Sequence, residues 1–148
     1  MKETKEEKNL TSWFELRQSL HGSNNPIQDV IDYWNGFGFT DHVGVLDPYF
    51  QRGWPTPWEI IAKGKIDDFT KATMIGYTFK YTEPRMFDVI EVRTYVDDTQ
   101  KRLYNVTVLD NTHVLNLNDT GACNVQDIPS HFRLDNVVAL TTNSSGRE

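Results

Sequence analysis

The chain has 148 residues, a formal net charge of −6 at pH 7 and one cysteine. This length fits one domain with a sizeable core, and an aromatic share of 12% favours a packed core over disorder. The negative charge argues against a general nucleic-acid binder, because such proteins need a basic surface to neutralise phosphates. One cysteine allows neither an internal disulfide nor a cysteine-rich zinc site, and no apolar run reaches membrane-spanning length. We therefore expect a soluble protein of a reducing compartment.

The N-terminal half of the chain predicts helices. Residues 1–10 are mostly charged and form either a frayed arm or the first turns of a helix that runs through Trp13 and Leu20. Asn25 and the proline after it open a second helix, in which apolar residues recur at helical spacing up to Trp34. Two glycines then end this helix.

Residues 54–80 predict two further helices joined by a glycine. Thr56 and Glu59 have the spacing of a capping box at the start of the first. Asp67 or Asp68 caps the second, since acidic side chains are favoured at a helix N-terminus. Trp58 and Ile61 of the first helix share one face, as do the apolar residues of the second, and we expect both faces to be mostly buried.

Three runs rich in β-branched and aromatic residues follow and predict strands at residues 87–96, 103–109 and 113–117. The short connectors between them force antiparallel pairing. Residues 137–140 could supply a fourth strand. The sequence therefore predicts an α+β fold, with N-terminal helices packed on a C-terminal antiparallel sheet of three to four strands.

The expected domain organisation is simple. A charged arm covers residues 1–10, a single α+β domain covers residues 11–142, and a polar tail covers residues 143–148.

Residues 64–69, GKIDDF, followed by three antiparallel strands, resemble the transglutaminase-like branch of the papain-like fold. In that family a Gly-x-Cys-x-Asp-Phe-like segment places a nucleophilic cysteine at a helix N-terminus, where the helix dipole stabilises the thiolate. A histidine on the second strand and an aspartate on the third complete the catalytic set. The resemblance covers roughly residues 54–119.

Carried over to this chain, the catalytic set is missing. Ile66 stands at the position of the cysteine. Tyr104 and Asn105 open the second strand in the region of the histidine, and Asn116 or Asn118 takes the place of the acid. Isoleucine cannot act as a nucleophile, so the resemblance implies a pseudoenzyme with a degenerate site.

Short proteins with a WPTPWE helix ahead of such a segment also look like accessory proteins of tailed bacteriophages. The leading prediction is therefore a non-catalytic binding or structural accessory protein, located in the cytoplasm or the virion, without cofactor or metal. Its expected partner is a protein that docks on an exposed aromatic edge. The candidate residues of this edge are Trp54, Trp58, Tyr49 and Phe50.

The alternative is a small hydrolase or metal-dependent enzyme that uses Asp41, His42, Asp67 and His113. Aspartate and histidine suit both acid–base chemistry and metal ligation. Each residue also has a plainer interpretation, since aspartates form turns and caps and His113 could pair across strands. Stoichiometric metal binding would distinguish the two hypotheses.

One further set of residues has the chemistry of a nucleophile, an acid and a base: Cys123, Asp127 and His131, at spacings of four. Pro129 and the preceding turn argue against a shared helix face. We expect Cys123 to be a small hydrophobic residue, and thiol-directed reagents to leave function unchanged.

Overall fold

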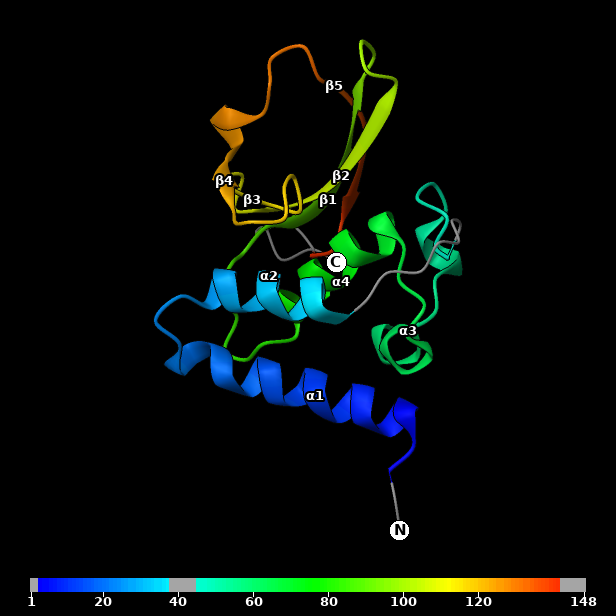
Figure 1. Cartoon of the computed structure of the whole chain (residues 1–148), viewed down its shortest axis with the longest axis vertical. Helices are drawn as coiled ribbons and strands as arrows, with labels where there is room; N and C mark the ends of the chain where they lie inside the picture. Colours follow the sequence, from blue (N-terminus) through cyan, green and yellow to red (C-terminus); the bar gives the residue numbers. More distant parts are fainter. Residues whose placement is uncertain (1–2, 38–44, 142–148) are drawn as a thin grey trace.

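The computed structural model describes residues 3–37 and 45–141. Helices occupy the first half of the chain and a sheet the second (Figure 1), so the predicted α+β fold is confirmed. The helices are α1 (Lys5–Ser19), α2 (Pro26–Phe37), α3 (Pro57–Lys63) and α4 (Asp68–Lys80). Short 3-10 turns lie at Leu20–Gly22, Gln51–Gly53 and Val125–Asp127.

The sheet is antiparallel throughout, with the strand order β4-β3-β2-β1-β5. Its strands are β1 (Ile90–Asp97), β2 (Arg102–Leu109), β3 (His113–Leu115), β4 (Cys123–Asn124) and β5 (Arg133–Ala139). The described part of the chain thus has five strands where three to four were predicted. The additional strand, β4, has two residues, which is too short for an alternating pattern to reveal.

The start of α4 is fixed by local caps. Thr56 and Glu59 form the predicted capping box of α3, and Gly64 ends that helix in the left-handed conformation, with φ 72°. Asp67 caps α4, where its Oδ1 accepts the backbone N–H of Thr70 at 2.9 Å. Asp68 is therefore the first residue of α4.

Helix α4 is the centre of the fold and lies between the sheet and the α1–α2 pair (Figure 1). Its residues from Phe69 to Phe79 are all buried. Gly76 allows the close approach to the sheet, because a Cβ there would lie 2.5 Å from Leu140 Cδ1. The Thr107 hydroxyl of β2 donates to the Ala72 carbonyl of α4 at 2.5 Å. The helical half thus packs on one sheet face, as predicted.

The opposite face of the sheet carries a second apolar cluster. Its buried members are Tyr95, Val106, Val108 and Val114. The chain from β4 toward β5 covers them with partly buried side chains, among them Cys123, Ile128 and Phe132. The two faces of the sheet are therefore both covered.

None of the helices within residues 3–37 and 45–141 is both long and apolar enough to cross a bilayer. Trp58, expected in the core because it shares a helix face with Ile61, is 41% exposed and packs by its edges against Trp13 and Tyr81. Helix α3 instead buries Pro57, Ile60 and Ile61.

Candidate active site

Three polar side chains meet at the N-terminus of α4. Asp68 is the first residue of that helix, Asn105 lies in β2, and Asn116 follows β3 directly. The Asn105 amide donates to Asp68 Oδ2 at 2.9 Å, and the Asn116 amide donates to Asp68 Oδ1 at 3.2 Å. Both oxygens of one half-buried carboxylate are thus held by carboxamides.

A further layer of hydrogen bonds orients the two carboxamides. The Thr94 hydroxyl of β1 donates to Asn105 Oδ1 at 2.8 Å, which fixes Nδ2 of Asn105 toward Asp68. The Asn116 amide also donates to the Asn105 carbonyl oxygen at 2.9 Å. Asn116 has a φ of 73°, a left-handed conformation that asparagine tolerates better than most residues. The carboxylate geometry is therefore set by three strands and one helix.

The register between α4 and β2 explains why Asp68 meets Asn105. Thr107 is bonded to Ala72. From Ala72 back to Asp68 the helix axis advances about 6 Å, and from Thr107 back to Asn105 the strand advances about 6.7 Å. Asn105 and Thr107 point to the same sheet face because strand side chains alternate. The hydrogen bond between Thr107 and Ala72 therefore also brings Asn105 beside Asp68.

Two cavities flank Asp68. The larger, of about 660 Å³, is lined by polar and charged groups that include Asn35, Lys71, Arg102 and Asp119, and also by Leu103, Tyr104 and Leu117. We call it the polar cavity. The smaller, of about 290 Å³, has mainly apolar walls and is called the apolar cavity. The apolar walls are Leu46, Pro48, Tyr49, Phe69 and Leu103. The polar residues in its lining are Asp67, Asp68, Thr94, Asn105 and Asp135. Asp68 and Leu103 line both cavities, so the two cavities adjoin at the start of α4, and together they are called the cleft.

Lys71 adds a positive charge one helical turn after Asp68. Its side chain is largely buried, and its ammonium group donates to Asn35 Oδ1 at 2.8 Å. Both Lys71 and Asp68 line the polar cavity. A carboxylate can move a proton and an ammonium can stabilise negative charge, so this cleft has groups suited to hydrolysis.

Of the residues predicted for the degenerate site, Asn105 and Asn116 come together, but around Asp68. Ile66 is fully buried in the core before the N-cap, so its side chain cannot line the cleft. Tyr104 reaches the polar cavity but stacks on Phe132 at 4.8 Å between ring centroids. Asn118 instead caps a turn, since its side-chain oxygen accepts backbone N–H groups of the following loop.

Sequence reasoning missed Asp68 and Lys71 as site residues. The sequence pattern predicts Asp68 only as an alternative to Asp67 for the N-cap of α4. The sequence does contain a signal for them. One of the two adjacent aspartates suffices for capping, which leaves the other for a second role, and Lys71 lies three residues after Asp68, on the same side of the helix.

Of the four residues of the predicted alternative enzyme, the described structure places Asp67 and His113, and these two lie at different places in the fold. Asp41 and His42 lie outside the described residues. Asp67 caps α4, and His113 packs against Phe87 at 5.7 Å between ring centroids. Within residues 3–37 and 45–141, no group of three or more histidine, cysteine, aspartate or glutamate side chains could hold a metal ion.

The predicted aromatic edge is divided between the two ends of α4. Tyr49 and Phe50 are 72% and 52% exposed, and Tyr49 lines the apolar cavity near the N-terminus of α4. Trp58 lies near the C-terminal end, against Tyr81. Trp54 is partly buried and packs on Phe69. A protein partner stays a prediction.

Cys123 lines neither of the two cavities beside Asp68. It lies in β4 and packs into the cluster on the sheet face opposite α4. Burial raises the pKa of the Cys123 thiol, and the Asp127 carboxylate raises it further. Both effects disfavour the thiolate, which is the reactive form.

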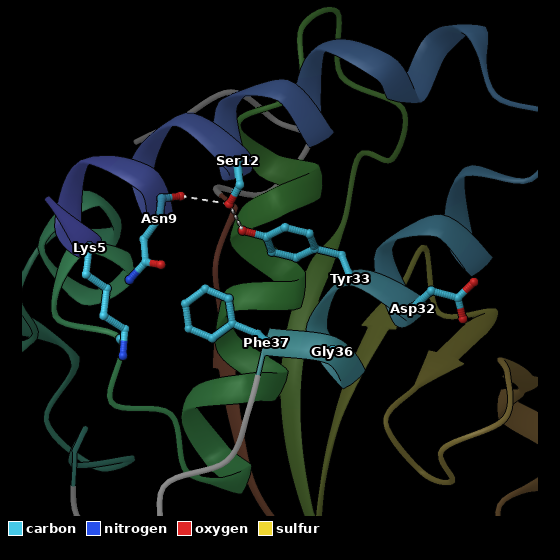
Figure 2. Close-up of a pocket in the computed structure, with 8 residues that line it drawn as sticks. Lys5, Asn9, Ser12, Asp32, Tyr33, Gly36 and Phe37 are labelled. Atoms are coloured by element: carbon cyan, nitrogen blue, oxygen red, sulfur yellow. Dashed lines mark hydrogen bonds between the residues drawn. The ribbon is translucent and has the colours of Figure 1, made fainter. Parts of the chain in front are cut away.

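A separate cavity of about 420 Å³ lies between α1 and α2 (Figure 2). Ser12 and Tyr33 meet at its wall, with their hydroxyl oxygens 2.7 Å apart. Because the Ser12 hydroxyl donates to the Asn9 carbonyl at 3.1 Å, the Tyr33 hydroxyl donates to Ser12. Burial raises the pKa of Tyr33 and keeps this donor protonated. The pair joins the two helices and has a structural role.

Replacing Tyr33 by phenylalanine is expected to lower the free energy of unfolding by about 1 kcal/mol, the usual net value of one hydrogen bond. Urea denaturation measures the change. Ser12→Ala and the double variant complete a cycle, in which the coupling should be positive. Strict additivity of the two losses would show that the bond contributes nothing.

No protein-family model matches the sequence, and no curated protein matches it. The structure is similar to Legionella pneumophila LapG in its calcium-bound form, with a TM-score of 0.66 and 21% identity over 90% of this chain and 75% of the LapG chain. The EGTA-treated form gives 0.66 and 22% over 90% and 73%. At this identity the similarity shows the fold, which is transglutaminase-like (papain-like).

This similarity corrects the predicted function. LapG is a protease with a transglutaminase-like fold. The predicted non-catalytic accessory role is contradicted by this match, as is the expectation that the chain is more likely not an enzyme. The predicted pseudoenzyme and the bacteriophage link have no support, whereas the transglutaminase-like fold expected from residues 64–69 is confirmed.

Proposed function

We propose that this chain is a hydrolase that cleaves peptide bonds, with the Asp68 carboxylate as its reacting group. The observation that carries the proposal is the meeting of Asp68, Asn105 and Asn116 in a cleft with a cavity on each side. Convergent polar groups in a cleft are the usual mark of an active site.

The placement of these residues supports the proposal. The transglutaminase-like pattern puts its nucleophile at a helix N-terminus, its histidine on the second strand and its acid on the third. Here Asp68 begins α4, Asn105 lies in β2 and Asn116 follows β3. The shared fold with a protease favours a peptide as the substrate. With aspartate at the first position, the attacking group is water and not a thiolate.

The chemistry needs a base, a site for negative charge and an acid. Asp68 takes a proton from a water molecule, whose oxygen attacks the peptide carbonyl carbon, and the carbonyl electron pair moves onto oxygen. The Lys71 ammonium, which lines the polar cavity, stabilises that oxygen. The C–N bond then breaks and the Asp68 carboxyl returns the proton to the departing amine. The products are a carboxylic acid and an amine.

The carboxamides position the base during these steps. Asn105 and Asn116 each donate to a different oxygen of Asp68. Each carboxylate oxygen can accept more than one hydrogen bond, so room remains for a water molecule. Because neither carboxamide titrates, proton transfer is assigned to Asp68.

The proposal is tested by incubating the purified chain with a proteome-derived peptide library in water enriched in ¹⁸O. Mass spectrometry should find new C-termini that carry one ¹⁸O atom. Cleavage should persist after iodoacetamide treatment and in the Cys123→Ser variant, because no thiol takes part. Absence of cleavage, or its loss in both thiol controls, would overturn the proposal.

A further inference from the structure

We infer that the apolar cavity is a specificity subsite that receives a large apolar side chain of the peptide, beside the bond held at Asp68. This inference rests on the proposed function. It names Leu103, Tyr49 and Phe69 as the residues that select the substrate.

The exposure of the cavity walls is the first support. Leu103 and Tyr49 are 59% and 72% exposed, although both are large and partly apolar. They line the same cavity, with the buried ring of Phe69 also in its wall. Grouped exposed apolar side chains around a concavity mark a binding site more often than scattered ones do. An apolar side chain placed there would cover all three.

Two hydrogen bonds to β5 hold the outer wall of the apolar cavity, which Pro48 and Tyr49 form. The Tyr49 hydroxyl donates to Asp135 Oδ2 of β5 at 2.9 Å, and the Asn136 amide of β5 donates to the Pro48 carbonyl at 3.2 Å. The Asp135 carboxylate raises the pKa of Tyr49, so this donor stays protonated. A wall tied to the sheet costs less entropy to order when a ligand binds.

The polar cavity, on the other side of Asp68, exposes more polar surface than the apolar cavity does. Lys71, Arg102 and Asp119 line it, and an apolar side chain there would leave charged groups poorly solvated. Leu103 lies at the boundary, since it lines both cavities. We therefore expect the apolar residue of the peptide to lie on the β5 side of Asp68.

Binding is measured by fluorescence anisotropy with fluorescein-labelled, alanine-based heptapeptides whose central residue is Phe, Leu, Ala or Asp. The Asp68→Asn protein is used so that no probe is consumed, and wild type is assayed for cleavage of the same peptides. The Phe and Leu peptides should bind at least about tenfold more tightly than the Asp peptide, as is usual for an apolar pocket.

Leu103→Asp should remove this preference, and the matched control Leu134→Asp should keep it. Leu134 is a similarly exposed leucine, 47% exposed, in β5, and it is not among the residues lining either cavity. Thermal melts of both variants should match wild type, because both side chains are largely in solvent.

The outcomes separate the subsite from the hydrolase. Equal binding of the Phe and Asp peptides, or a preference that survives Leu103→Asp, overturns the subsite. An apolar preference without cleavage by wild type supports the subsite and counts against the hydrolase. Cleavage without an apolar preference supports the hydrolase and overturns the subsite.

Discussion

Asp68→Asn is expected to lower kcat/KM for peptide cleavage by roughly 10²–10⁴-fold, the range associated with a general base. The carboxamide has nearly the same size as the carboxylate but cannot accept a proton at neutral pH. The loss should fall mainly on kcat, because the cavities that bind the peptide are unchanged.

The surrounding hydrogen bonds add to this effect. Asn105 and Asn116 both present N–H groups to Asp68. A carboxamide at this position has one oxygen and one NH₂ group. Its oxygen can accept the N–H of one asparagine, but its NH₂ group then faces the N–H donor of the other. Asn105 cannot rotate its amide to adapt without losing the bond from Thr94.

Asp88→Asn provides the matched control. It makes the same change of charge at an exposed residue. Asp88 lies just before β1, several residues along that strand from Thr94, which is the β1 residue next to the Asp68 site. Its kcat/KM should equal that of wild type. If Asp68→Asn stayed within about threefold of Asp88→Asn, Asp68 could not be the base and the proposed mechanism would be wrong.

The helices were predictable because their boundary signals are local. Thr56 and Glu59 satisfy each other within one turn, and Asp67 bonds to a residue three positions later. Such contacts depend on a few neighbouring residues, so the sequence states them directly. The alternation of β1 and β2 was visible for the same reason.

The reacting position was not predictable, because it depends on contacts between distant segments. Either Asp67 or Asp68 could have capped α4. The structure distinguishes them: Asp67 also accepts the N–H of Val45 at 3.4 Å, while Asp68 meets Asn105 and Asn116. Motif counting assigned Ile66 instead, since spacing along the chain carries no information on which side chain faces the cleft.

Trp58 shows the same limit for burial. Helical spacing placed it on a face with Ile61 but could not say which face of α3 meets the core. The structure buries Ile60 and Ile61 and leaves Trp58 at the edge between α1 and the end of α4. Periodicity therefore identifies a shared face without locating it.

Thr78→Val should produce a large loss of stability. The Thr78 hydroxyl oxygen accepts the indole N–H of Trp13 at 2.9 Å and that of Trp34 at 3.1 Å. These three residues come from α4, α1 and α2 and are almost completely buried. Valine has the same shape but no acceptor, so two buried N–H groups would lose their partner.

Leaving one buried polar group unsatisfied costs about 1–3 kcal/mol, so the free energy of unfolding should fall by roughly 2–5 kcal/mol in urea denaturation. Thr73→Val is the matched control. Thr73 is equally buried, and its hydroxyl donates to the carbonyl four residues earlier, as Thr78 does. The indole N–H groups of Trp13 and Trp34 bond to Thr78 and not to Thr73, so the loss for Thr73→Val should stay below about 1 kcal/mol. Thr78→Ser should recover most of the stability because the acceptor returns. Equal losses at positions 73 and 78 would show that the two indole bonds do not hold the three helices together.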